Sequence, residues 1–481
     1  MSGGNNNDLD LDLVKLATGK TWDQISRSQS ARQSIESLVE YISFDSDPRL
    51  IGWDSDGKEY NVFDSELDSH MHIMGATQEG KSRFLQLLIR EDLQRGIGAC
   101  LLDPSHNADT AQQLLAWCAS TGFAKVCYIN HADFEQFDRV PSIQPIKHHV
   151  RKEVTIGNIK DAFHVLWGTK PQDVTRIEKY VPAVMEALWA AHLTLADIGP
   201  FLDRDRWEER NHILDAKNLS STNRAHLERA FGNGTTYEQQ FSPTINRLNP
   251  LADETLSLIL GSMNGAVPWQ EMIRKGWLVL VNLDPTATWG GDRNPQRLLG
   301  TVIITEILYA MDRALAGGWK GRYRLYIDEA GEYVTPKISH VLDLKAKTGL
   351  SLALAHQRLD HIEDRNVRSA IEANCKAKFV FFTNKREDRD TMLRNMGYGG
   401  DIPDRAVSHE MAQTPKQFTW ARVQKRPPRK IEIVEVEDAV ISKDDLIAFK
   451  KKIYNYPWFY SRQTIKQEIS ARTIETQSRF S

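Results

Sequence analysis

Eight consecutive residues have the types and the spacing needed to hold a phosphate group. They are Gly75-Ala76-Thr77-Gln78-Glu79-Gly80-Lys81-Ser82, which match the pattern GxxxxGK[ST] at every fixed position. The glycines let backbone N–H groups curl around phosphate oxygens, the lysine meets the β and γ phosphates, and the hydroxyl ligates Mg²⁺. An apolar run precedes the motif and helical periodicity follows it, as this chemistry requires. We therefore predict a loop that binds ATP and Mg²⁺, with Lys81 on the phosphates and Ser82 on the metal.

Two later apolar runs end in side chains that suit the same chemistry. One run ends in Asp328 and Glu329, and the next ends in Gln357. An acid at a strand end can hold Mg²⁺, a second acid can act as a base toward water, and a glutamine can sense the γ phosphate. We predict these roles for Asp328, Glu329 and Gln357 respectively, with Lys81 completing the catalytic set. An acid pair after an apolar run also marks a helix start, which is the alternative interpretation.

Short apolar runs with helical stretches between several of them indicate the elements that position these residues. Strands buried on both faces have this pattern, which favours an α/β fold with a mostly parallel sheet covered by helices. The expected strands are His72–Met74, Ala99–Leu102, Val126–Ile129, Leu278–Val281, Leu325–Ile327, Leu352–Ala355 and Phe379–Phe382.

The strand signal is missing between residues 154 and 275, where segments of helical periodicity are separated by Gly, Asn and Pro. We predict an all-α subdomain inserted into the sheet. The expected organisation is a flexible leader (1–20), a helix from Trp22 to Ile42 with a β-hairpin lead-in (21–66), an ATPase core in two parts (67–153 and 276–400) around the all-α insert (154–275), and C-terminal strands, a basic loop and a helical tail (401–481).

Composition describes a folded protein, because 41% of the 481 residues are hydrophobic and the formal net charge is only −3. This net charge does not indicate a nucleic-acid partner. If the protein binds nucleic acid, its basic residues must be concentrated on one face or in a pore. The four cysteines have no CxxC spacing, which favours core positions in a reducing compartment over a metal site. Neither a signal peptide nor an apolar stretch of membrane-spanning length occurs, so we expect a cytoplasmic protein without membrane insertion.

Three further features each leave two interpretations open. Asp103, after its apolar run, could order Mg²⁺ or form an Asp-Pro turn. The basic loop, residues Lys425–Lys430, could contact phosphates or simply be solvated. The aromatic cluster, Tyr454, Tyr456, Trp458, Phe459 and Tyr460, could stack on single-stranded bases, although docking of the tail on a neighbouring domain or subunit is favoured.

The order of these motifs resembles the HerA/FtsK superfamily of ring-forming, DNA-pumping ATPases, and within it the coupling proteins of type IV secretion. The resemblance runs from about Leu50 to Phe382. It rests on the phosphate loop, Leu101–His106, the Asp328-Glu329 strand, the Ala355-His356-Gln357 strand end, Gly276–Leu283 and Leu298-Leu299-Gly300. It implies a RecA-like P-loop ATPase core, a homo-hexamer with ATP between subunits, and DNA in a central channel.

Two departures from the family pattern stand out. Coupling proteins usually begin with membrane-spanning helices, which this sequence does not show. Many relatives also carry an Arg-Lys pair before the glycine that precedes the sensor strand, and here Ala346 stands at the arginine position. A trans-acting finger could instead come from Arg365, Arg368 or Lys347, and the sequence does not choose among them.

The leading hypothesis is an ATP-driven DNA translocase working in conjugative transfer, mobile-element or defence complexes, with a relaxase, nuclease or other effector as partner. An ATPase that moves protein cargo, or an ATP-gated assembly scaffold, is the alternative. DNA-stimulated turnover with steep salt dependence would favour the translocase.

Overall fold

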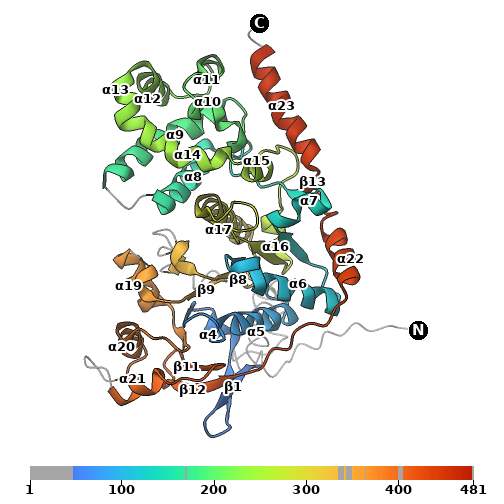
Figure 1. The fold of residues 1–481 in the computed structure, drawn as a ribbon, viewed down its shortest axis with the longest axis vertical. Helices are drawn as coiled ribbons and strands as arrows, with labels where there is room; N and C mark the ends of the chain where they lie inside the picture. Colours follow the sequence, from blue (N-terminus) through green and yellow to red (C-terminus); the bar gives the residue numbers. More distant parts are fainter. Residues whose placement is uncertain are drawn as a thin grey trace, which may run out of the picture.

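The computed structural model describes residues 47–167, 171–333, 338, 341–342, 349–362, 364–398 and 405–478 (Figure 1). The predicted leader and the predicted helix from Trp22 to Ile42 lie outside the described residues. The described chain is organised around a single sheet of 11 strands, in the order β2-β1-β12-β11-β10-β3-β9-β8-β4-β7-β5.

The part of the sheet from β10 to β5 is entirely parallel. All residues of these strands are buried, as expected for a parallel sheet covered on both faces. The strands are β3 (Met71–Met74), β4 (Gly98–Asp103), β5 (Val126–Ile129), β7 (Leu278–Asn282), β8 (Tyr323–Ile327), β9 (Leu350–His356) and β10 (Ala377–Val380). The predicted α/β class is therefore confirmed, except that β10 ends two residues earlier than Phe382.

Alternate side chains of one strand show the two covered faces. Phe379 of β10 contacts Phe84, on the helix after the phosphate loop, with ring centroids 4.6 Å apart. Val380 instead packs with Met392 and Leu393 on the other side of the sheet. Helices of the core are α4 (Asp64–Leu67), α5 (Lys81–Gln94), α6 (Asp109–Thr121), α7 (Phe134–Phe137), α17 (Arg293–Ala316), α19 (Arg365–Asn374), α20 (Arg386–Asn395) and α21 (Arg405–Met411).

Between the short strand β6 (Val140–Pro141) and β7 the described chain contains helices only, which we call the helical insert. Most of this segment forms one end of the molecule in Figure 1, whereas its last helix lies beside α17. Its helices are α8 (Lys152–Trp167), α9 (Pro171–Ala190), α10 (Gly199–Leu202), α11 (Trp207–Leu214), α12 (Ser221–Gly232), α13 (Gly234–Thr236), α14 (Ser242–Leu248), α15 (Glu254–Leu260) and α16 (Trp269–Arg274).

The N-terminal hairpin and the C-terminal strand pair join the same sheet as an antiparallel wing. Its strands are β1 (Arg49–Asp54), β2 (Glu59–Val62), β11 (Phe418–Val423) and β12 (Arg429–Ile433). β1 pairs with β12, so that Gly52 lies opposite Ile433, and β11 pairs with β10. A Cβ on Gly52 would lie 2.0 Å from the Glu432 carbonyl oxygen, so only glycine fits this close approach. The sequence assigned these two strand pairs to separate segments, whereas the sheet unites them.

The chain ends in α22 (Lys443–Ile453), β13 (Phe459–Tyr460) and α23 (Arg462–Ser478), which run along one side of the molecule (Figure 1). Lys450 binds Asp133 at 2.8 Å, and β13 pairs with β6. Farther along, Glu468 accepts hydrogen bonds from Ser262 and Asn264, and Arg472 binds Asp197 at 3.0 Å. The tail therefore contacts first the core and then the helical insert.

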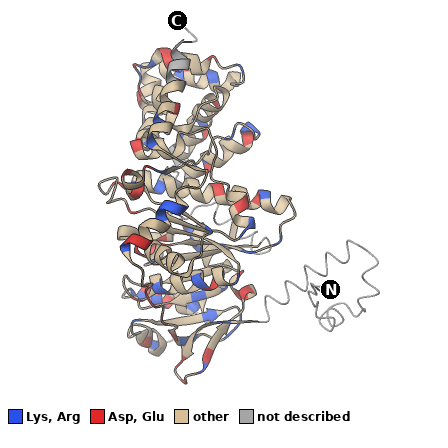
Figure 2. Cartoon of the chain, turned by 90° about the vertical axis from the view of Figure 1, so that its right-hand side faces the viewer, with Lys and Arg blue, Asp and Glu red and all other residues tan. Residues whose placement is uncertain are grey.

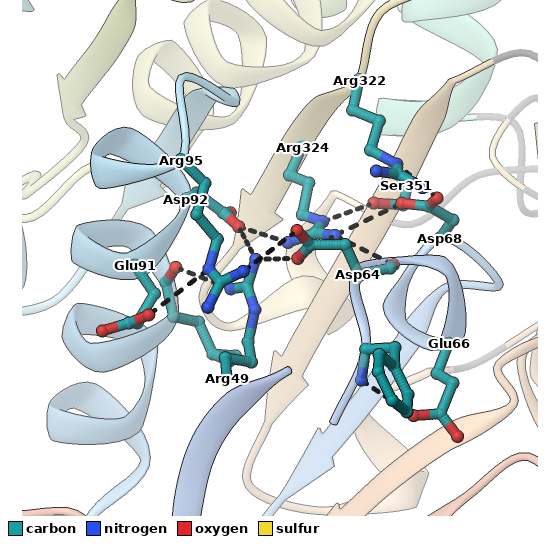
Figure 3. A network of polar contacts seen from close by, with 12 residues as sticks. Arg49, Asp64, Glu66, Asp68, Glu91, Asp92, Arg95, Arg322, Arg324 and Ser351 are labelled. Atoms are coloured by element: carbon teal, nitrogen blue, oxygen red, sulfur yellow. Dashed lines mark hydrogen bonds and ion pairs between the residues drawn. The ribbon is translucent and has the colours of Figure 1, made fainter. Parts of the chain in front are cut away.

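A buried network of charges ties β1, the first strand of the described residues, to the core. Figure 3 shows its side chains converging between α5 and the strands. Arg49 and Arg324 both bind Asp64 and Asp92, and the side chains of all four residues are fully buried. The Tyr326 hydroxyl donates to Asp92 over 2.5 Å. Each charge has a partner, which is the condition for tolerating such groups away from water.

Charged residues of both signs are mixed along the ribbon in one view of the molecule. In Figure 2, Lys and Arg are interspersed with Asp and Glu over the view shown. No single helix in the described ranges combines the length and apolar composition needed to cross a membrane, and only a pair bent by 118°, Val174–Ala190 with Leu195–Leu202, meets those criteria jointly.

Candidate nucleotide-binding site

The predicted phosphate loop connects β3 to α5, with Gly80 as the residue before the helix. Gly80 has φ 113° and Gln78 has φ 64°, both in the left-handed region. A Cβ added to Gly75 would lie 2.5 Å from the Cβ of Phe381, so the loop can pass this side chain only as glycine. The turn leaves backbone N–H groups at the start of α5 directed toward the loop, which is the arrangement that binds anions.

Lys81 begins α5 and turns its ammonium group back into the loop. Its Nζ donates to the carbonyl oxygens of Gly75, at 2.6 Å, and Ala76, at 3.0 Å. Burial lowers the pKa of Lys81, while Asp328, Glu329 and Glu79 act in the opposite direction. The ammonium is thus a positive charge held beside acids, where it can meet an incoming phosphate.

Asp328 and Glu329 follow β8, at the same edge of the sheet as the phosphate loop. Asp328 is 4% exposed. Burial, with the charges of Asp103 and Glu329, raises its pKa to about 7, against the opposing effect of Lys81. Glu329 has φ 48° and ψ 47°, a left-handed conformation that costs energy for a residue with a side chain.

Strand β9 lies between the phosphate-loop strand β3 and the acid strand β8, and this order brings Gln357 to Glu329. The side-chain amide of Gln357 donates to Glu329 Oε1 over 2.6 Å. The residue before it, His356, accepts a backbone hydrogen bond from Gly75 N at 3.2 Å. The structure therefore brings together the predicted residues Lys81, Asp328, Glu329 and Gln357.

The residues present fit a nucleotide with a hard cation. A buried carboxyl group with a raised pKa gains from a nearby cation, which favours its ionised form. Asp328 provides such a carboxylate, and Ser82, at the start of α5, provides the hydroxyl of the loop motif. Carboxylate and hydroxyl oxygens are ligands that Mg²⁺ accepts. The left-handed loop and Lys81 supply the complementary phosphate contacts.

Asp103, for which the sequence left two roles open, acts as a structural cap. Its carboxylate accepts from the backbone N–H groups of Ser105, at 3.0 Å, and Ala111, at 2.9 Å, and from the Ser105 hydroxyl. Burial raises its pKa. The Asp-Pro turn is therefore the better interpretation, and Asp103 affects the site through its charge on Asp328.

The finger candidates differ in their surroundings. Arg365 is exposed at the start of α19. Arg368 donates to the Ile362 carbonyl oxygen over 2.6 Å within its own subunit. Lys347 lies outside the described residues.

The basic loop follows Val423, the last residue of β11, which lies opposite Ala377 at the start of β10. Because β10 runs parallel to β3, its start lies at the edge of the sheet opposite the phosphate loop, and the basic loop lies there too. Arg426 binds Glu66 at 2.5 Å, Arg429 binds Asp54, and Lys430 lies 3.4 Å from Glu410. These internal partners argue against a free phosphate-binding patch.

The aromatic cluster docks the tail on the core. Tyr454 is 1% exposed and donates to Asp133 over 2.7 Å. The ring of Trp458 lies 4.8 Å from that of Tyr456 and 5.6 Å from that of Trp277. These rings are engaged within the chain, in agreement with the favoured interpretation.

The cysteines also lie in the interior. All four are free and buried, and burial raises the pKa of each thiol. Among the described residues, no group of three or more His, Cys, Asp or Glu side chains has the arrangement of a metal site.

Residue types and spacing indicated the candidate catalytic groups but not the contacts that position them. No motif singled out His72, which contacts His356. The only available signal was a polar side chain inside each of two apolar strands.

With this geometry, the chain has the fold of a RecA-like P-loop ATPase, as predicted. Comparison with solved structures agrees. The bacterial conjugative coupling protein TrwB, in its unbound form, matches with a TM-score of 0.59 and 15% identity over 82% of this chain and 91% of TrwB. VirB4 of Thermoanaerobacter pseudethanolicus matches with a TM-score of 0.53 and 15% identity, covering 84% and 98% of the two chains.

The plasmid coupling protein TrwB in complex with ADP and Mg²⁺ matches with a TM-score of 0.55 and 15% identity over 79% of this chain and 88% of that one. No protein-family model and no curated protein sequence matches the chain. The likeness to conjugative coupling proteins is therefore one of fold.

Proposed function

We propose that this protein is an ATP-driven DNA translocase that works as a coupling-protein-like motor. The observation that carries the proposal is the convergence of Lys81, Asp328, Glu329 and Gln357 where the phosphate loop meets β8 and β9. A protein that only bound ATP would not need a second acid in contact with a sensor. The resemblance of the motifs to DNA-pumping ATPases, together with the fold shared with a conjugative coupling protein, supports DNA as the cargo.

Each side chain has a defined task in the proposed reaction. Lys81 would leave its carbonyl partners to bind the β and γ phosphates, and Ser82 and Asp328 would hold Mg²⁺, which would offset phosphate charge. Glu329 accepts a hydrogen bond from the attacking water and takes up its proton as the water oxygen bonds to the γ phosphorus, the bond to the bridging oxygen breaks and ADP leaves. Gln357 is already bonded to Glu329, so movement of one is transmitted to the other. Strand β9, which ends directly before Gln357, then transmits this movement away from the phosphates.

The assembly is proposed by analogy with the ring-forming motors. A homo-hexamer would place ATP between subunits and DNA in a central channel. Arg365 and Arg368, on α19 after the sensor strand, remain candidates for a trans-acting finger. A relaxase, nuclease or other effector in a cytoplasmic conjugation, mobile-element or defence complex would be the partner.

The test is ATP hydrolysis by the wild type and by Glu329→Gln, with and without single- and double-stranded DNA, at several salt concentrations. The mass of the ATP-bound complex is measured alongside. DNA-stimulated turnover that falls steeply with salt, together with a ring, supports the translocase. Turnover indifferent to DNA would reject DNA as cargo and favour protein cargo. Unchanged turnover in Glu329→Gln would reject the site itself.

A further inference from the structure

Two buried histidines meet beneath the candidate site. His72 is on the phosphate-loop strand β3, and His356 is the last residue of the neighbouring strand β9. Both are 0% exposed. Their Nε2 atoms lie 2.6 Å apart, and the ring centroids are 4.8 Å apart. Because β3 and β9 are parallel with Met74 opposite His356, the two rings project from the same face of the sheet.

The hydrogen-bond partners determine which nitrogen carries a proton. His356 Nδ1 lies 3.0 Å from the carbonyl oxygen of Arg358, which can only accept, so Nδ1 carries the hydrogen. In a neutral ring His356 Nε2 is then the acceptor, and His72 Nε2 must donate to it. His72 Nδ1 is left as an acceptor that has no hydrogen-bond partner among the described residues.

The surroundings keep both rings neutral. Burial lowers the pKa of His356 to about 4. For His72 burial again lowers the pKa, and His356 and Lys378 act in the same direction. Lys378 lies opposite His72 on β10, and its ammonium donates to the carbonyl oxygens of Glu372, at 3.0 Å, and Cys375. The direction of the His72-to-His356 hydrogen bond is thus fixed.

His356 is held from three sides, directly before the sensor glutamine. Its backbone oxygen accepts from Gly75 N of the phosphate loop, its Nδ1–H donates to Arg358 across Gln357, and its Nε2 accepts from His72. These contacts fix the backbone on both sides of Gln357. Its side chain can then place the amide 2.6 Å from Glu329 Oε1.

We propose that His72 and His356 form a positioning pair that sets Gln357 relative to Glu329 and the phosphate loop. The pair does not touch the reacting atoms, and its effect passes through Gln357. The inference rests on the proposed ATPase function. Apolar side chains would fill the same interior without the cost of burying hydrogen-bonding groups, so packing alone does not account for two imidazoles here.

The experiment is a double-mutant cycle on steady-state ATP hydrolysis. His72→Phe keeps a ring of similar size but removes the donor, and we expect kcat to fall about tenfold with KM for ATP unchanged. In a Gln357→Ala background, His72→Phe should lower kcat little further, because His72 acts on the reaction only through Gln357. His72→Gln, which returns an N–H donor near the Nε2 position, should restore most of kcat.

A second variant distinguishes loss of the His72–His356 hydrogen bond from loss of folding. His356→Asn keeps a donor for Arg358 but loses the acceptor for His72, and it should reproduce the kcat loss of His72→Phe. His131→Phe is the matched control, because His131 is 4% exposed and bonds Thr288 away from the predicted catalytic residues. Its kcat should equal that of the wild type.

The outcomes separate the two proposals. Additive losses in the cycle, or a kcat in His72→Gln no better than in His72→Phe, would overturn the positioning pair while leaving the ATPase assignment intact. Full turnover in Gln357→Ala would overturn the role of Gln357 and the pair with it. Absence of turnover in the wild type, with or without DNA, would reject the proposed function itself.

Discussion

Gln357 donates a hydrogen bond to Glu329 Oε1 over 2.6 Å, and the two residues come from neighbouring parallel strands. The bond places a neutral amide against the carboxylate that we propose as the base. Water or a γ phosphate that enters beside Glu329 must compete with this amide for the carboxylate. The contact is therefore a natural place for hydrolysis to be sensed.

Replacing Lys81 with Ala should abolish detectable ATP turnover and weaken nucleotide binding. We propose that the buried ammonium meets the phosphates, and loss of a charge-stabilising group of this kind typically lowers rates by about 10²- to 10³-fold. Turnover and binding of a fluorescent ATP analogue are the measurements. Lys450→Ala, which removes a lysine paired with Asp133 on the tail, is the control that should retain turnover.

Glu329→Gln should separate binding from hydrolysis. The amide keeps the shape of the side chain but cannot take a proton, so ATP should bind with wild-type affinity while turnover falls at least a hundredfold. Loss of binding along with turnover would mean that Glu329 contacts the nucleotide or supports the loop instead. Glu332→Gln, three residues later and outside the predicted catalytic set, provides the matched change and should hydrolyse ATP normally.

Asp328→Asn should stabilise the nucleotide-free protein in a pH-dependent way. The pKa of Asp328 is raised to about 7 in the folded protein, against about 3.9 in an unfolded chain. Between these values the folded state binds more protons, so this group makes folding less favourable as pH rises. The gain in melting temperature should grow from about pH 4 to about pH 7 and then level off. Asp56→Asn, in an exposed turn, should show no such trend.

Arg324→Met should destabilise the protein by about 3–5 kcal/mol, because it leaves Asp64 and Asp92 buried without one of their partners. Urea unfolding followed by circular dichroism gives the free energy. Lys466→Ala removes a partner of Glu254 on the surface and should change it little. Similar losses for both variants would show that burial of the network does not matter.

Trp458→Ala tests the role of the aromatic cluster. Trp458 is 8% exposed and packs against Tyr456 and Trp277, so truncation should cost about 3–5 kcal/mol of stability. Affinity for single-stranded DNA, measured where the variant is folded, should not change. A large loss of affinity without loss of stability would favour base stacking.

Local sequence determined the parts of the site that depend on the chain's own backbone. The Gly75–Ser82 motif specifies a phosphate loop because glycine conformations and a following helix are properties of neighbouring residues. Continuous apolar runs likewise specified buried parallel strands, although the end of β10 was displaced because Phe381 and Phe382 are apolar beyond the strand.

Only the tertiary structure decided which distant residues meet. The pattern of apolar residues along a strand does not specify its neighbours in the sheet, because pairing depends on crossovers and register. It therefore could not predict that β9 lies between β3 and β8 or that β1 pairs with β12. For the same reason the sequence could not show that Arg426 binds Glu66 or that His72 bonds His356. The candidate catalytic groups follow from residue type and spacing, whereas their mutual positions follow from packing between segments far apart in the chain.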